Sequence, residues 1–171
     1  MEKILEKISQ YHLLNVLLPG VFFVYLSERI ASINLLTNEI IFNIFVIYLY
    51  GLVCSRIGSL VVEPILKKIK FVQFVQYEDY LKASQTDPKL AELNTDNNFY
   101  RTIIGVCISE TFLLAFKYLM NHFAFINDHA SWILLGLCFL LFLFSYQKQT
   151  RYINKRVKNE LKKTPQNTCN R

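Results

Sequence analysis

Several patterns that mark catalytic and metal sites are missing from this sequence of 171 residues. It has no HExxH pair, nucleophile elbow, phosphate-binding glycine loop or pair of catalytic carboxylates. Its four cysteines are far apart and form no CxxC pair, which excludes a cysteine-based zinc site and argues against a disulfide framework: Cys54, Cys107, Cys138 and Cys169. We therefore expect no enzyme, no cofactor and no bound metal.

Two further absences concern partners and processing. The net charge is +6, yet no basic helix carries an interleaved base-reading pattern, so anionic lipid is a better partner than nucleic acid. No small-residue cleavage site follows the first apolar run, where Tyr25-Leu26-Ser27-Glu28 stands, so we interpret this run as a retained helix. Hydrophobic residues make up 53% of the chain and aromatic residues 15%, which is more apolar than a soluble domain. The composition predicts a protein that lies in a lipid bilayer.

Four apolar runs predict an all-α membrane protein with four transmembrane helices. A helix needs about 20 apolar residues to cross a membrane, and the runs cover about residues 11–33, 39–62, 99–120 and 131–147. They divide the chain into an interfacial helix with the first helix pair (1–62), a cytoplasmic helical segment (63–100), a second helix pair (101–147) and a basic helix with a disordered tail (148–171). Within the middle segment, Asp87-Pro88 predicts the start of a short helix through Leu93, followed by a turn at residues 94–98.

The distribution of lysine and arginine predicts the orientation. Both termini and the segment 63–101 are rich in these residues, whereas the two opposite loops contain only Arg29. Positive residues remain on the cytoplasmic side of a membrane. We therefore expect the N-terminus, the middle segment and the C-terminus in the cytoplasm, with the middle segment packed as a small helical cap on the inner ends of the spans.

Small residues predict where the transmembrane helices pack closely. In the second span they recur at spacings of three and four, which places them on one face and lets another helix approach. A proline followed by glycine in the first span predicts a kink beside a close contact. The candidate packing residues are Pro19, Gly20, Gly51, Ser55, Gly58 and Gly105.

Ionisable residues within the spans are candidates for function, because burying a charge in a membrane is costly. These candidates are Arg56, Glu63, Glu110 and Lys117. Arg56 and Glu110 both lie on the order of 10 Å from the inner ends of their spans, so they suit an ion pair. Alternatively, Arg56 pairs with Glu63 while Glu110 is protonated or bonded to serine or threonine. A third possibility is that these groups line a path for ions or protons.

Two functions remain open from the residues alone. A small channel or transporter subunit would use the buried charges, whereas a membrane anchor or scaffold would use its cytoplasmic surfaces to bind a partner protein. For such docking the candidates are Lys67, Lys68, Lys70, Tyr77, Tyr80 and Arg101.

Three short motifs carry a resemblance to a family. At Leu17-Leu18-Pro19-Gly20, at Ser55-Arg56-Ile57-Gly58-Ser59 with Glu63-Pro64, and at Asn97-Asn98-Phe99-Tyr100-Arg101-Thr102, the chain resembles small, uncharacterised multi-span bacterial membrane proteins that we associate with anti-phage defence loci. The resemblance implies a homo-oligomeric, pore-forming or membrane-perturbing effector in the bacterial inner membrane. A signal or protein partner would act on its cytoplasmic cap.

Overall fold

The computed structural model describes residues 13–168, and every regular element in this part of the chain is helical. The elements are η1 (Leu13–Leu17), α2 (Leu18–Arg29), α3 (Ile40–Ile57), η2 (Gly58–Val62), α4 (Glu63–Lys68), α5 (Tyr77–Thr86), α6 (Lys89–His122), α7 (Ala124–Asp128) and α8 (Ala130–Thr168). Both η1 and η2 are π-helical turns that continue directly into the next α-helix. The interfacial helix predicted for residues 1–10 lies outside the described residues.

Three helices are long and apolar enough to cross a membrane: Ile40–Lys68, Lys89–His122 and Ala130–Asn159. They contain the second, third and fourth predicted spans, and they support a membrane protein. The first predicted span corresponds to η1 and α2, which together run from Leu13 to Arg29. At 1.5 Å per residue this helix is about 25 Å long, slightly shorter than a hydrocarbon core of about 30 Å. A fourth crossing therefore remains a prediction.

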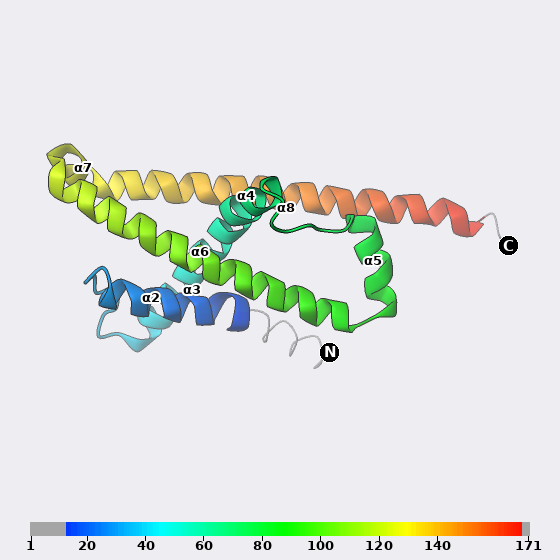
Figure 1. Ribbon diagram of the computed structural model, residues 1–171, viewed down its shortest axis with the longest axis horizontal. Coiled ribbons are helices and arrows are strands. Elements are labelled where there is room, and N and C mark those ends of the chain that lie inside the picture. The colour runs from blue at the N-terminus through cyan, green and yellow to red at the C-terminus, as the bar shows by residue number, and fades with distance from the viewer. Residues whose placement is uncertain (1–12, 169–171) are drawn as a thin grey trace.

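The first helix packs with α3 and α6 into what we call the three-helix unit: η1 with α2, α3 with η2, and α6. Figure 1 shows α2 alongside α6, with α3 and η2 crossing behind them. The connection between α2 and α3 is short, so these helices are neighbours, as its length predicts. Apolar side chains from all three helices form the core of the unit: Phe23, Val24, Cys54 and Val106.

Glycines bring the backbones of this unit into direct contact. A Cβ atom at Gly51 would collide with the carbonyl of Val16, and one at Gly105 would collide with the carbonyl of Cys54. Gly20 and Gly58 are also buried, and a Cβ at Gly58 would lie 2.7 Å from the carbonyl oxygen of Arg101. Such close approach is what small residues allow between transmembrane helices. Of the other candidate packing residues, Pro19 is buried and Ser55 is half-buried.

The helix that contains the third predicted span is longer than that span, because α6 begins at Lys89 and does not stop at Leu93. Its start follows Asp87, whose carboxylate accepts a hydrogen bond from the backbone N–H of Lys89 at 2.9 Å. The predicted turn at residues 94–98 is wrong, since this stretch is helical. Within this stretch the Thr95 hydroxyl donates to the carbonyl of Ala91 one turn earlier, at 3.0 Å.

In the segment predicted as a cap, residues 63–100, the chain forms α4, α5 and the first turns of α6, and no residue of α5 is buried. Tyr77, Tyr80, Leu81 and Ser84, which the sequence places on one helical face, are all half-buried, and α5 contacts α6. Figure 1 shows α5 beside the first turns of α6, at the end remote from α7. A cap that covers the inner ends of all the spans is not established.

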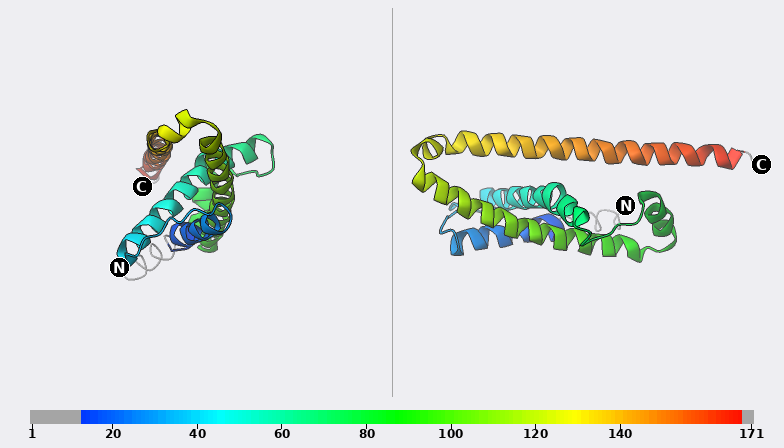
Figure 2. Two further views of the ribbon diagram at one scale, coloured as in Figure 1. Left: turned by 90° about the vertical axis from the view of Figure 1, so that its left-hand side faces the viewer. Right: turned by 45° about the horizontal axis from the view of Figure 1, so that its top comes forward.

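The last helix, α8, is one continuous element of 39 residues, about 58 Å long. It joins the predicted fourth span to the predicted basic helix without a break and continues through Thr168. Figure 2 shows α8 running apart from α6 and α2 along most of its length. Among its described side chains only Ser145 is buried. It meets the three-helix unit at a single crossing with α3 and η2.

Candidate functional site

Charged residues from three helices meet at Glu63, the first residue of α4. One carboxylate oxygen of Glu63, Oε1, lies 2.6 Å from the ammonium of Lys67. The other, Oε2, lies 2.7 Å from Nη1 of Arg101 on α6 and 3.4 Å from Nζ of Lys148 on α8. We call these four residues the Glu63 cluster. The Glu63 side chain is only 9% exposed, and its three cationic partners are 22% to 42% exposed.

Lys148 joins α8 to the three-helix unit. Besides its approach to Glu63, its ammonium donates to the carbonyl oxygen of Ser59 at 2.6 Å and to the Ser59 hydroxyl at 2.8 Å. The Ser59 carbonyl belongs to η2, the π-helical turn. An ammonium has three donors, so these contacts use the full bonding capacity of Lys148. Its side chain is therefore the main polar attachment of α8 at this crossing.

The lengths of α6 and α8 indicate the depth at which the Glu63 cluster would lie in a membrane. The distance along α8 from Ala130 to Lys148 is about 27 Å, and the distance along α6 from His122 back to Arg101 is about 32 Å, at 1.5 Å per residue. Both lengths match a hydrocarbon core of about 30 Å. If the α7 end lies at one membrane surface, the cluster lies at the other. The positive-inside prediction makes this the cytoplasmic surface.

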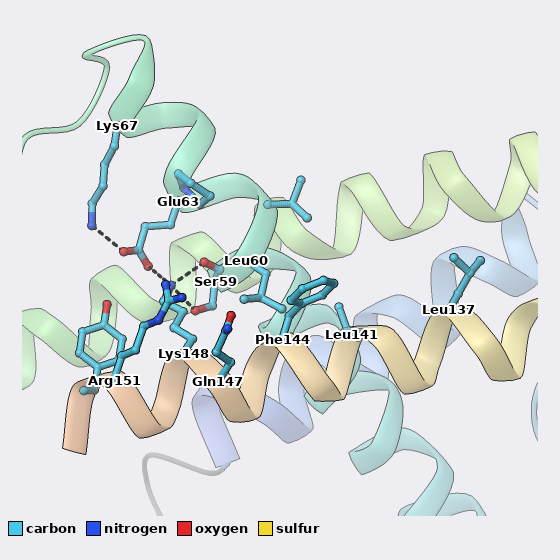
Figure 3. Close-up of a pocket in the computed structure, with 13 residues that line it drawn as sticks. Ser59, Leu60, Glu63, Lys67, Leu137, Leu141, Phe144, Gln147, Lys148 and Arg151 are labelled. Atoms are coloured by element: carbon cyan, nitrogen blue, oxygen red, sulfur yellow. Dashed lines mark hydrogen bonds and ion pairs between the residues drawn. The ribbon is translucent and has the colours of Figure 1, made fainter. Parts of the chain in front are cut away.

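A groove of about 640 Å³ opens beside the cluster, between α8 on one side and η2 with α4 on the other. Figure 3 shows Glu63, Lys67, Lys148 and Arg151 gathered at one end of it. Apolar side chains line the rest, mostly along α8: Leu60, Val61, Leu137, Leu141 and Phe144. The groove is thus charged at the end next to the Glu63 cluster and apolar along α8 toward Leu137.

A second polar site is buried inside the three-helix unit. The hydroxyl of Ser27 on α2 donates to Oε1 of Glu110 on α6 at 2.5 Å, and the same hydroxyl oxygen lies 3.0 Å from the carbonyl oxygen of Phe23. A hydroxyl has one proton, so these two acceptors compete unless the carboxyl carries a proton of its own. The other carboxyl oxygen of Glu110, Oε2, is buried and has no partner among the described residues.

Neither ion pair expected for Arg56 forms. Glu110 bonds to Ser27, and Glu63 is occupied by its three cations. Arg56 is half-buried in α3, and within the described part of the chain it makes no hydrogen bond or ion pair. The reason lies in the tertiary arrangement, because α6 and α8 supply cations to Glu63 at closer range. The alternative in which Glu110 bonds to a serine or threonine agrees with the structure on this one point, because Glu110 accepts a hydrogen bond from Ser27.

The remaining candidates are dispersed. Lys117 lies at the α7 end of α6 and donates to the carbonyl of Ala31 at 2.5 Å, which ties α6 to the loop after α2. Of the predicted docking residues, Lys67 and Arg101 are engaged by Glu63, whereas Lys68 and Lys70 are exposed.

Comparison with protein-family models, curated proteins and solved structures finds no match.

Three partners in these sites were missed by sequence reasoning: Ser27, Ser59 and Lys148. The serines offered no signal beyond being polar residues in apolar runs, because their importance depends on which helix lies opposite. Lys148 did offer one, since it is the first charge after the fourth apolar run. Placing that charge at the same membrane depth as Glu63 would have paired them.

Proposed function

We propose that this protein is a non-enzymatic effector of the bacterial inner membrane that forms homo-oligomers and permeabilises the bilayer when a cytoplasmic signal or partner releases α8. The observation that carries the proposal is the attachment of α8. This helix is long enough to cross the membrane and extend beyond it, yet one crossing at Lys148 holds it to the three-helix unit. A helix held in this way can move without unpacking the core.

Arg56 supports the oligomeric part of the proposal. An arginine within a membrane span costs about 2.5–3.5 kcal/mol on insertion scales, and such residues face protein or water. In the described part of one chain, Arg56 has neither an ion-pair partner nor a hydrogen bond. Assembly of several copies gives this guanidinium a polar partner or a water-filled path. The proposed role in anti-phage defence rests on the resemblance to small multi-span bacterial membrane proteins. The motifs at residues 17–20, 55–64 and 97–102 carry this resemblance.

In this mechanism the Glu63 cluster is the latch. It lies at the cytoplasmic membrane surface, where a soluble partner or signal reaches it, and it connects α4, α6 and α8 through one carboxylate. A competing anion or partner that removes Lys148 from Ser59 and Glu63 frees α8. The exposed apolar face of α8 is then available to other copies: Trp132, Leu135 and Phe139.

Leakage from vesicles tests the proposal. The purified protein is reconstituted into vesicles with a potassium gradient, and a voltage-sensitive dye reports depolarisation. Because Lys148→Met removes the latch, it should leak without a signal, whereas the wild type and Lys155→Met should retain the gradient. Lys155 is a suitable control because it is exposed on the same helix and makes no bond in the described structure. If Lys148→Met inserts normally and never leaks, the effector proposal fails.

A second function, a membrane anchor for a cytoplasmic protein, is favoured by the far end of α8. Beyond Lys148 the helix continues for about 30 Å as a basic element. Its described side chains there are largely exposed: Arg151, Lys155, Arg156 and Lys158. Substitutions at Lys155, Arg156 and Lys158 can abolish the phenotype of cells that express the protein while Lys148→Met leaves that phenotype unchanged. In that case anchoring replaces permeabilisation as the function.

A further inference from the structure

The groove between α8 and η2 with α4 is open on one side, and its lining changes character along its length. Three cations and one carboxylate line it: Lys67, Lys148, Arg151 and Glu63. Since the lining holds three cations and one carboxylate, the charged end has an excess of positive charge. Arg101, which also binds Glu63, adds to this excess from α6.

The cations differ in how many donors remain for a ligand. Lys148 uses its three donors on Ser59 and Glu63, but Lys67 makes one hydrogen bond, to Glu63. Arg151 lines the groove with no hydrogen bond or ion pair among the described residues. Its guanidinium has five N–H donors in a planar arrangement that suits phosphate. Arg151 and Lys67 therefore present free donors at the charged end.

The apolar end extends from the charged end into the membrane. Phe144, Leu141 and Leu137 follow one another along α8 over about 10 Å. One leaflet of the hydrocarbon core is about 15 Å thick, so this wall covers the greater part of a leaflet. Figure 3 shows these side chains continuing along α8 from Lys148 and Gln147. An anionic headgroup with an attached acyl chain matches both ends of the groove.

We infer that this groove is a binding site for an anionic phospholipid, with its phosphate held by Arg151 and Lys67 and its acyl chain against Leu137, Leu141 and Phe144. Basic pockets between transmembrane helices at the cytoplasmic surface bind such headgroups. A zwitterionic lipid carries its own cation beside the phosphate, so its headgroup is not complementary in charge to the positive end of the groove. A free anion has no acyl chain and therefore gains nothing from contact with the apolar wall. The inference holds whether or not the protein permeabilises membranes.

Native mass spectrometry of the full-length protein in detergent tests the site. The protein is titrated with dioctanoyl phosphatidylglycerol, with dioctanoyl phosphatidylcholine and with inorganic phosphate. Phosphatidylglycerol should bind the tightest. Because one cation near a phosphate contributes about 1 kcal/mol, Arg151→Gln should weaken phosphatidylglycerol binding about fivefold and leave phosphatidylcholine binding unchanged.

Matched variants separate a site from a diffuse charge effect. Arg156→Gln removes an exposed cation from α8 outside the groove and should leave binding unchanged. Leu141→Trp obstructs the apolar wall and should weaken phosphatidylglycerol binding by a similar factor, whereas Leu140→Trp, outside the groove, should not. Three results overturn the inference: equal binding of phosphatidylcholine, inorganic phosphate binding as tightly as the lipid, or an equal loss from Arg156→Gln.

Discussion

Ser27 on α2 and Glu110 on α6 are joined by a hydrogen bond of 2.5 Å between side chains 83 positions apart in the chain. Both residues are buried, and the bond connects two helices of the three-helix unit. Hydrogen bonds between helices of membrane proteins average about 0.6 kcal/mol and reach about 1.7 kcal/mol. This bond therefore adds modestly to a core in which glycines bring backbones together.

Removing the Ser27 hydroxyl should destabilise the three-helix unit, because it leaves the buried carboxyl of Glu110 without its partner. For Ser27→Ala we expect the free energy of unfolding to fall by about 1 kcal/mol, measured by titration with sodium dodecyl sulfate in mixed micelles. Thr111→Ala is the control, because the exposed Thr111 hydroxyl bonds only to its own helix, at the carbonyl of Cys107. Equal losses from the two variants would contradict the assignment.

Glycine substitutions should separate packed from open helix surfaces. Gly105→Ala forces a methyl group against the backbone of Cys54, which cannot rotate away as a side chain would, so the free energy of unfolding should fall by about 2 kcal/mol. Gly136→Ala meets nothing within 4 Å and should be neutral, or stabilising by up to about 1 kcal/mol through helix propensity. Comparable destabilisation by both would show that the packing assigned to Gly105 is wrong.

Loss of the contacts that Lys148 makes with Ser59 and Glu63 should increase the mobility of α8. Spin labels at two exposed positions, Lys68 and Ile153, report the distance between α4 and α8 by pulsed electron resonance, in a background without the native cysteines. We expect a narrow distribution in the parent protein and a broad one in Lys148→Met. The Lys155→Met variant should match the parent. An unchanged distribution in Lys148→Met would mean that apolar contacts alone hold α8.

The number of crossings can be tested by accessibility from the outside of cells. We expect a cysteine placed at Glu39, in the loop between α2 and α3, to react with a membrane-impermeant thiol reagent in intact cells. A cysteine at Asp128, at the end of α7, should do the same, whereas one at Lys82 on α5 should react only after lysis. Protection of Glu39 with reaction at Asp128 would mean that α3 does not cross. The first crossing is tested by a cysteine at Glu2, which should react only after lysis, and its reaction in intact cells would leave three crossings and remove the first.

We expect Arg56 to add nothing to the stability of the monomer and to be necessary for the vesicle leak. Because its guanidinium has no described partner within one chain, Arg56→Met should not lower the free energy of unfolding of the monomer in micelles. The same variant, combined with Lys148→Met, should suppress the vesicle leak that Lys148→Met produces alone. A loss of stability in Arg56→Met would identify a structural role, and an unchanged leak would exclude Arg56 from the conducting path.

Local patterns predicted much of this fold. The second, third and fourth apolar runs all lie in helices long enough to cross a membrane. The face of α5 formed by Tyr77, Tyr80, Leu81 and Ser84 is its half-buried face. Helix ends were harder to predict, since Thr95 and its neighbours have the composition of a turn and yet continue α6. A hydroxyl can cap a new helix or bond back to its own, and residue type does not distinguish the two.

The sequence by itself determined which segments are long and apolar enough to enter a membrane and, by its lysines and arginines, which ends are expected in the cytoplasm, because the transfer of each side chain into lipid depends mainly on its own chemistry. The partners of the charged groups were decided by the tertiary structure. Arg56, Arg101 and Lys148 are all cations near one end of a span, but α6 and α8 bring the last two to Glu63 and leave Arg56 without a bond in the described chain. Electrostatic attraction depends on the distance between charges, and that distance is set by how the helices cross.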